Sequence, residues 1–134
     1  MNFVLSHGVD ALEPQDLDGF FVDWPTSPSL DRRLAIVRAA DEVIVARDDS
    51  GAVVGFITAL TDGVFAALIP LLEVLPDWQG GGVGTALVAA MLDRLKACYM
   101  IDLACDDELV AFYSRLGGTR LKAMAWRNYD QLAV

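Results

Sequence analysis

Hydrophobic residues in the middle of the chain follow the two-residue period that is typical of strands. Residues 42–60, EVIVARDDSGAVVGFITAL, place strand formers on both sides of Asp49-Ser50-Gly51. Thr61-Asp62-Gly63 then predicts a second tight turn before VFAALIPLLEV, residues 64–74. These features predict a three-stranded antiparallel meander.

The segment before the meander predicts one strand and two helices. Residues 2–6 have a strand pattern, and Glu13-Pro14 predicts the start of a short helix that ends near Trp24-Pro25. Ser27 followed by Pro28 predicts the cap of a second helix over residues 28–40.

The segment after the meander predicts alternating helices and strands. Leu87, Met91, Leu92 and Leu95 recur at helical spacing after a glycine-rich loop. The remaining elements are, in order, a buried strand at 99–105, a helix at 106–116 and closing strands at 119–129. The fold class is therefore α/β with a mixed sheet.

Composition narrows the classes of protein that fit this pattern. A chain of 134 residues that is 54% hydrophobic is expected to form one domain over residues 1–134. Its net charge of −9 argues against a nucleic-acid partner and weakly favours cationic ones. No apolar run approaches the ~18 residues of a membrane span, and no signal peptide precedes the first strand. We therefore expect a cytoplasmic protein with no membrane partner.

The loop PDWQGGGVGTALVAA, residues 76–90, has four glycines within five positions before a predicted helix. The first turn of a helix has unpaired N–H groups and a positive dipole end, which together bind phosphate when no side chain intervenes. Glycines can also adopt positive φ and bring successive amides toward one anion. The loop therefore predicts a pyrophosphate site, with a simple strand-to-helix turn as the alternative.

The residues that this loop lacks narrow the classes of phosphate ligand that it could bind. No Lys-Ser or Lys-Thr follows Gly84, so a nucleoside-triphosphate loop is disfavoured. A dinucleotide fingerprint would need a third small residue where Leu87 stands, and the remaining chain is too short to complete a nicotinamide domain.

Two motifs resemble one known family. Gln79-x-x-Gly82-x-Gly84, after Val74-x-Pro76, resembles the acetyl-CoA motif of the GNAT family of N-acetyltransferases. DDELVAFYSRLGG, residues 106–118, resembles the final motif of that family, in which a helix presents Phe-Tyr ahead of Leu-Gly. The resemblance covers the chain from about Val43 to Trp126. It implies a GNAT-like mixed, mostly antiparallel sheet with a splayed parallel strand pair and about four flanking helices.

The resemblance also implies a cofactor site. Leu72 and Val74 would pair with the pantetheine arm of acetyl-CoA where the strands splay. The pyrophosphate would be held by the backbone amides of a continuous segment, which comprises Gln79, Gly80, Gly81, Gly82, Val83, Gly84 and Thr85. Asp106 stands where many relatives have an asparagine that contacts the cofactor, and Gly81 stands where relatives commonly have a cation.

Acetyl transfer to an alkyl amine needs a base and an acid. The amine has a reference pKa of about 10 and must lose a proton before it attacks the thioester. Glu73 is the only ionisable residue in its apolar strand and is the candidate base, although a solvent-facing position is the simpler interpretation. The resemblance places Tyr113 beside the sulfur as the general acid, and an aromatic anchor for its helix is the alternative.

The sequence thus predicts an acetyl-CoA-dependent N-acetyltransferase that acts on a small-molecule or protein amine by direct attack in a ternary complex. The alternative is a non-catalytic acyl-CoA sensor on the same fold. His7 is expected to be structural or at the surface, with no metal site, and Asp62 to form a turn. The partly apolar C-terminal end, which includes Met124, Trp126 and Tyr129, predicts a homodimer.

Overall fold

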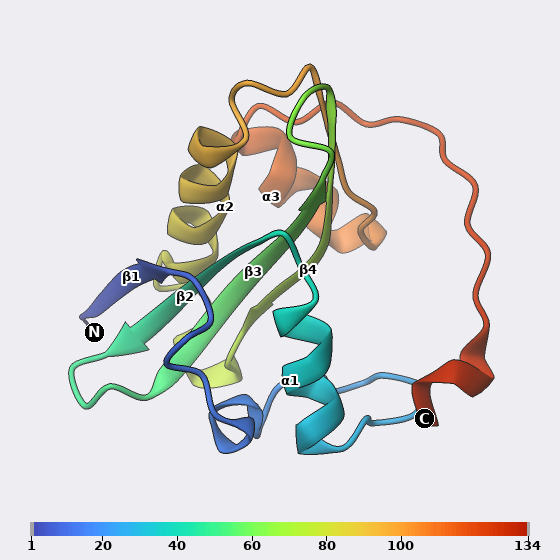
Figure 1. Ribbon diagram of the computed structural model, residues 1–134. Coiled ribbons are helices and arrows are strands. Elements are labelled where there is room, and N and C mark those ends of the chain that lie inside the picture. Colours follow the sequence, from blue (N-terminus) through green and yellow to red (C-terminus); the bar gives the residue numbers. More distant parts are fainter. Residues whose placement is uncertain (1, 134) are drawn as a thin grey trace.

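A computed structural model describes residues 2–133 and contains one five-stranded sheet in the order β1-β2-β3-β4-β5 (Figure 1). Neighbouring strands are antiparallel from β1 to β4, whereas β4 and β5 are parallel. The strands are β1 (Phe3–His7), β2 (Glu42–Asp48), β3 (Val53–Thr61), β4 (Ala66–Val74) and β5 (Met100–Asp102). The predicted α/β class, the meander and the parallel pair are confirmed.

The turns of the meander are stabilised by aspartates. Asp62 Oδ1 accepts hydrogen bonds from the N–H groups of Val64, Phe65 and Ala66 at 2.7–3.1 Å. These hydrogen bonds lower the pKa of Asp62, and the one from the Phe65 N–H contributes most. Asp62 is therefore the turn former that the sequence predicted.

The described residues form three α-helices and four 3-10 segments, where the sequence predicted about four helices. The α-helices are α1 (Leu30–Arg38), α2 (Val83–Arg94) and α3 (Val110–Arg115); the 3-10 segments are η1 (Pro14–Leu17), η2 (Pro76–Trp78), η3 (Asp107–Leu109) and η4 (Tyr129–Ala133). Ser29, not Ser27, caps α1, because the Ser29 hydroxyl accepts the N–H of Arg32 at 3.1 Å.

The two faces of the sheet are covered by different parts of the chain (Figure 1). On one face α2 packs on the sheet, with Leu87 and Met91 fully buried in a cluster that also contains Ile57. On the other face residues 9–38, which include η1 and α1, bury Phe21 and Phe56. We call these the helix face and the N-terminal face.

Two predictions about the first and last thirds of the chain were wrong. The helix expected to end near Trp24-Pro25 is only the 3-10 turn η1. The strand expected at 99–105 is reduced to β5, whose outer residues Met100 and Asp102 are exposed rather than buried. β5 is short because it is the edge strand of the sheet and, within residues 2–133, has β4 as its one strand partner.

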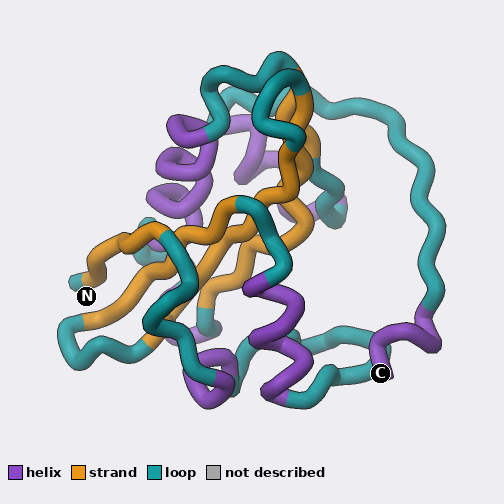
Figure 2. The backbone as a smooth tube through the Cα atoms, in the orientation of Figure 1, coloured by secondary structure: helices purple, strands orange, loops and turns teal. Residues whose placement is uncertain are grey.

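The closing strands predicted at 119–129 are also absent. These residues run as an extended loop away from the sheet before they reach η4 (Figure 2). A strand needs a neighbour that hydrogen bonds to it, and no backbone N–H from Thr119 to Asn128 donates to another backbone group within residues 2–133. None of the helices within residues 2–133 has both the length and the hydropathy of a membrane span.

Candidate functional site

The loop between η2 and α2, together with the first turn of α2, has backbone N–H groups without partners. None of the N–H groups from Gly80 to Thr85 donates a hydrogen bond to a group in the described part of the chain. Gly80 and Gly82 have φ angles of +80° and +92°, and a side chain at either position would extend into open space. Gly82 is also the N-cap of α2 and has no side chain to cap it. The geometry suits an anion held by backbone amides.

The two other glycines of the loop have different surroundings. An added Cβ at Gly84 would lie 3.4 Å from the ring of Phe112, so this glycine permits the close approach of α3 to α2. Gly81 has no positive φ, so its backbone conformation does not require glycine. The absence of a cation at Gly81 is therefore a property of this sequence rather than a demand of the backbone.

Beside the loop, the parallel strands separate after a short contact. β4 pairs with β5 only from Ala66 to Leu68, yet β4 continues to Val74. Leu72 and Val74 therefore lie where β4 has no strand on its β5 side. The side-chain amide of Gln79 donates to the Val74 carbonyl at 3.1 Å and closes the end of this opening.

Glu73 lies half-buried on the N-terminal face, opposite Phe56 in the register of β3 and β4. Its Oε1 accepts the N–H of Phe21 at 2.8 Å. Burial raises the pKa of Glu73, and the Phe21 hydrogen bond and the Arg33 charge oppose that rise only in part. A solvent-facing position on an exposed side of the sheet was the simpler sequence interpretation, and it is wrong.

Two buried polar atoms on the N-terminal face have no hydrogen-bond partner among the residues described. They are Glu73 Oε2 and Thr58 Oγ1. Thr58 is opposite Leu71, two residues from Glu73 along β4, so the two side chains are diagonal neighbours on the same face. Unpartnered buried polar atoms are uncommon, so these two oxygens are candidates for hydrogen bonds to a bound polar group or water.

The chain segment that covers Glu73 is strained. Phe21 and Asp23 have φ angles of +61° and +64°, although neither is a glycine. The Phe21 ring packs against Trp24 at 4.6 Å between centroids, and the Arg33 guanidinium lies 5.8 Å from the same ring. Such backbone strain is maintained only when surrounding contacts hold it, and it is concentrated at functional sites.

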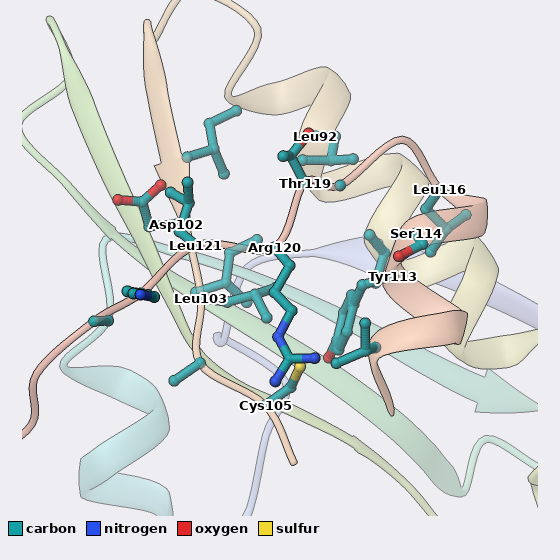
Figure 3. Close-up of a pocket in the computed structure, with 18 of the residues that line it drawn as sticks. Leu92, Asp102, Leu103, Cys105, Tyr113, Ser114, Leu116, Thr119, Arg120 and Leu121 are labelled. Carbon is teal, nitrogen blue, oxygen red and sulfur yellow. The ribbon is translucent and has the colours of Figure 1, made fainter. Parts of the chain in front are cut away.

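Tyr113 lies on the helix face in a cavity of about 450 Å³ between α3, β5 and the segment that follows α3 (Figure 3). Burial raises the pKa of Tyr113, and the neighbouring Cys105 thiol adds to the rise. Its ring packs edge-on against Phe112 at 4.9 Å. Glu73 does not line this cavity, so the structure does not bring the two candidate residues into one pocket.

Asp106 and Cys105 precede α3 and are both exposed. Asp106 is the N-cap residue of η3, but its side chain makes no capping hydrogen bond. The next residue, Asp107, forms an ion pair with Arg120 at 3.3 Å, which connects η3 to the segment after α3.

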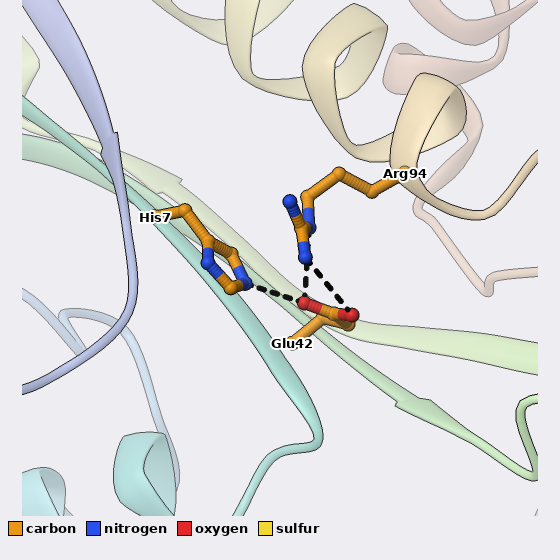
Figure 4. A network of polar contacts seen from close by, with 3 residues as sticks. All are labelled: His7, Glu42 and Arg94. Carbon is orange, nitrogen blue, oxygen red and sulfur yellow. Dashed lines mark hydrogen bonds and ion pairs between the residues drawn. The ribbon is translucent and has the colours of Figure 1, made fainter.

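His7 contributes to the contact between β1, β2 and α2 (Figure 4). His7 Nε2 lies 2.6 Å from Glu42 Oε2, and the Arg94 guanidinium lies 3.0 Å from the same oxygen. Burial alone would raise the pKa of Glu42, but the hydrogen bonds from Arg94 and His7 lower it. His7 is therefore structural, as expected. No group of three potential metal ligands occurs in residues 2–133.

Sequence reasoning missed Thr58, Phe21 and Gly55. The first two become relevant only because β3 and the 20–24 segment meet at Glu73, and no local pattern encodes that contact. Gly55 is needed because a Cβ there would lie 3.1 Å from Val83 and 3.2 Å from Leu87 of α2. A glycine inside an apolar strand was the only signal available.

Comparison with known proteins supports the fold and the motifs. The sequence model of the Acetyltransferase (GNAT) family matches residues 9–118. A crystal structure of a candidate acetyltransferase from Deinococcus radiodurans R1 is 41% identical, with a TM-score of 0.92, and the match covers 98% of this chain and 93% of that one. Glucosamine-6-phosphate N-acetyltransferase from Arabidopsis thaliana, at 19% identity and a TM-score of 0.72, shares the fold over 97% of this chain and all of that one.

Among curated proteins, the uncharacterized N-acetyltransferase ycf52 of Pyropia yezoensis is 27% identical over 113 residues. The match covers 78% of this chain and 65% of the relative. The chain thus spans about two thirds of the length of that relative.

Proposed function

Because the chain belongs to the acetyltransferase (GNAT) family, we propose that it is an enzyme that transfers the acetyl group of acetyl-CoA to a primary amine. Both substrates bind at once, and the amine attacks the thioester directly. The observation that carries this proposal is the loop from Gly80 to Thr85, where six backbone N–H groups are free of partners at the start of α2. Residues 1–134 act as one catalytic domain.

The cofactor lies between the two separated strands. The amides from Gly80 to Thr85 hold the pyrophosphate, whereas the Gln79 N–H is already donated to the Pro76 carbonyl at 3.2 Å. The free edge of β4 at Leu72 and Val74 pairs with the pantetheine arm. Asp106 lies beside this path with a free carboxylate, which repels phosphate rather than binding it. Together with the missing cation at Gly81, this charge makes the affinity for acetyl-CoA modest.

Glu73 is the general base. A carboxyl group whose pKa is raised by burial accepts a proton more readily near neutral pH than an ordinary glutamate does. Oε1 is engaged by Phe21, so the unpartnered Oε2 faces the amine. Thr58 Oγ1, the second unpartnered atom, accepts a hydrogen bond from the same ammonium group. A protonated amine therefore has two acceptors on the N-terminal face.

Tyr113 is the general acid. The ammonium ion loses one proton to Glu73, nitrogen forms a bond to the acetyl carbon, and the carbon–sulfur bond breaks. The leaving sulfur takes the phenolic proton of Tyr113. The attacking nitrogen gives up its second proton, which restores the Tyr113 phenol through solvent, and Glu73 releases the first proton to solvent, so one proton is released over the whole reaction. Because burial raises the pKa of Tyr113, the phenol remains protonated and ready to donate near neutral pH.

The acceptor is a small-molecule or protein amine, and the net charge of −9 favours its cationic form. The acceptor pocket lies on the N-terminal face, where this chain has its strained segment at Phe21 and Asp23. We propose that the enzyme works as a homodimer.

The alternative is an acyl-CoA sensor without catalysis. It is favoured by the missing cation at Gly81 and by the separation of Glu73 from the cavity that contains Tyr113. Both functions require acetyl-CoA to bind, so binding alone does not distinguish them.

The test has two stages. Acetyl-CoA is expected to raise the melting temperature by mass action, whereas NADH and ATP leave it unchanged. Free thiol release is then measured with polyamines, aryl-alkyl amines and amino sugars. Turnover with any amine supports the enzyme, binding without turnover supports the sensor, and equal stabilisation by all three nucleotides contradicts the cofactor site.

A further inference from the structure

The cavity that contains Tyr113, which we call the Tyr113 cavity, lies at the closed end of the gap between β4 and β5. The last paired residues of the two strands are Leu68 and Asp102, and Ile69, the next residue of β4, lines the cavity. The glycine loop lies at the other, open end of the gap, beyond Val74. A pantetheine arm that enters from the loop and follows β4 away from Val74 therefore points toward the cavity.

Helix α2 gives the same direction. Its first turn has the free amides of the proposed pyrophosphate site, and Val88 and Leu92, farther along the helix, line the cavity. At ~1.5 Å per residue, Leu92 lies about 12 Å along the helix axis from Gly84. Loop, gap and cavity therefore follow one another in the order of the phosphate, the arm and the acyl group of an acyl-CoA.

The lining of the Tyr113 cavity is mostly aliphatic and has one polar side. Ile69 and Val88 are buried and belong to the core cluster of the helix face. The polar groups of Tyr113, Cys105 and Arg120 point toward one side of the cavity (Figure 3). Such a lining suits a ligand with a polar head and a hydrocarbon tail. Four half-buried aliphatic side chains that pack against the same cluster also line the cavity: Leu92, Ile101, Leu103 and Leu116.

The Tyr113 cavity is larger than an acetyl group needs. Its volume is about 450 Å³. This is roughly three times the ~150 Å³ of a cavity that holds one benzene molecule. An acetyl group has a single methyl beyond its carbonyl and would leave most of the aliphatic lining in contact with water. A longer hydrocarbon tail would remove that lining from water, which is the contact that the hydrophobic effect favours.

The cavity wall formed by the segment after α3 is held in place, but one of its apolar side chains is uncovered. The Gly118 N–H donates to the Tyr113 carbonyl at 3.0 Å, and Arg120 pairs with Asp107 of η3 at 3.3 Å. Leu121, which also lines the cavity, is 71% exposed. A hydrocarbon tail in the cavity would contact this leucine.

We propose that the Tyr113 cavity binds the hydrocarbon tail of an acyl-CoA with about six to eight acyl carbons, and that the enzyme transfers this acyl group to its amine. The inference rests on the proposed function, since it needs CoA at the glycine loop and Tyr113 beside the sulfur. The amine nitrogen forms a bond to the acyl carbonyl carbon, the carbon–sulfur bond breaks, and the protons move as in acetyl transfer. The amine approaches from the N-terminal face at Glu73, while the tail extends on the helix face.

Isothermal titration with CoA and with acetyl-, butanoyl-, hexanoyl- and octanoyl-CoA tests the tail site. The Kd is expected to fall roughly two- to fourfold for each added methylene group until the cavity is filled. The readout is the Kd of CoA divided by the Kd of octanoyl-CoA, so effects on the shared CoA part cancel. If CoA and acetyl-CoA bind but this ratio stays near one, the tail site alone is overturned. If neither binds, the proposed cofactor site fails and the tail site fails with it.

Leu92→Trp places the tail within the protein, because a larger side chain there would fill the aliphatic part of the cavity. The ratio is expected to fall at least tenfold. Leu5→Trp is the matched control, since Leu5 is also half-buried and packs against the same cluster but does not line the cavity. A ratio that Leu92→Trp leaves at the parent value overturns the proposal.

Leu121→Asp keeps the proposal testable if Leu92→Trp does not fold. Because Leu121 is exposed, an aspartate there is compatible with the fold, but it places a carboxylate against the tail, and the ratio is expected to fall at least tenfold. Val64→Asp is the control, since Val64 is 78% exposed at the β3–β4 turn and lies outside the cavity. A ratio lowered by Val64→Asp and not by Leu121→Asp would place the tail on the outer surface and overturn the proposal.

Discussion

The two faces of the sheet present different kinds of ligand contact. On the helix face, the free donors are backbone amides at the start of α2, and the glycines there keep side chains away from them. On the N-terminal face, the free polar atoms belong to the side chains of Thr58 and Glu73 and lie under a strained segment. Backbone N–H donors suit a ligand group that is the same in every substrate, whereas polar side chains suit a ligand group that differs from one substrate to another.

The two faces of the sheet also differ in how much folding stability their ligand contacts cost. Positive φ is readily adopted by glycine, as at Gly80 and Gly82, but it costs roughly 1–2 kcal/mol for a residue such as Phe21. The N-terminal face also keeps a half-buried carboxyl group with one oxygen unpaired. We infer that stability has been given up on the N-terminal face rather than on the helix face.

Substitution of Tyr113 should have the largest effect and should leave the N-terminal face unchanged. For Tyr113→Phe, turnover is expected to fall by ~10²–10⁴-fold while acetyl-CoA binding stays nearly intact, because a positioned acid contributes that much. Tyr99→Phe is the control, since its exposed ring does not line the cavity that contains Tyr113. If rate and binding both stay within a small factor of the parent, Tyr113 is only a helix anchor.

Glu73→Gln should separate activity from stability on the N-terminal face. Turnover is expected to fall by about 10²-fold and to recover partly at higher pH, where more of the amine is already neutral. The melting temperature at neutral pH is expected to rise, because the folded state no longer buries a charge. A variant that loses stability at neutral pH would show that the carboxylate is favourable in the fold.

The pH dependence of the parent protein follows from the same shift. The folded pKa of Glu73 is raised above the ordinary 4.5, so the folded state binds more protons than the unfolded state above that pH. The stability contribution of this group is therefore highest below pH 4.5 and falls as pH rises through the folded pKa. Denaturant titrations at several pH values across this window should show the free energy of unfolding of the parent falling, relative to that of Glu73→Gln, as the pH rises.

Changes in the glycine loop should alter binding without a direct effect on chemistry. Gly82→Val is expected to weaken acetyl-CoA at least tenfold, because a β-branched residue does not readily adopt a φ of +92°. Gly81→Arg is expected to tighten binding, since the backbone at this position does not require glycine and an added cation attracts phosphate. Isothermal titration measures both. Equal affinities for the three proteins would make the loop a simple turn.

Thr58→Val should have the smallest effect and should be confined to the acceptor. The hydroxyl is buried without a partner in the ligand-free fold, so its removal is expected to keep or slightly raise the melting temperature. The KM for the amine is expected to rise about five- to tenfold, by the loss of one hydrogen bond to a charged group. An unchanged KM, measured with the amine that the panel identifies, would remove Thr58 from the acceptor site.

Local sequence determined much of the fold. Asp62 beside Gly63 specifies the turn between β3 and β4. The alternation of hydrophobic and polar residues at 42–60 specifies the meander. The glycines within residues 80–84 specify a helix N-terminus without covering side chains. Each of these depends on residues within a few positions of one another. Short-range sterics and hydrogen bonding suffice for such features, so the sequence predicted them correctly.

Tertiary structure decided the environments of the side chains and the fate of the last segment. Glu73 is buried because Phe21, 52 residues away, donates to it, and Thr58 is its neighbour through strand register. The pattern at 119–129 is typical of a strand, but a strand forms only where a second strand supplies hydrogen bonds, and within residues 2–133 no strand hydrogen bonds to this segment. Burial, pKa and strand pairing depend on contacts between distant segments, which only the folded chain brings together.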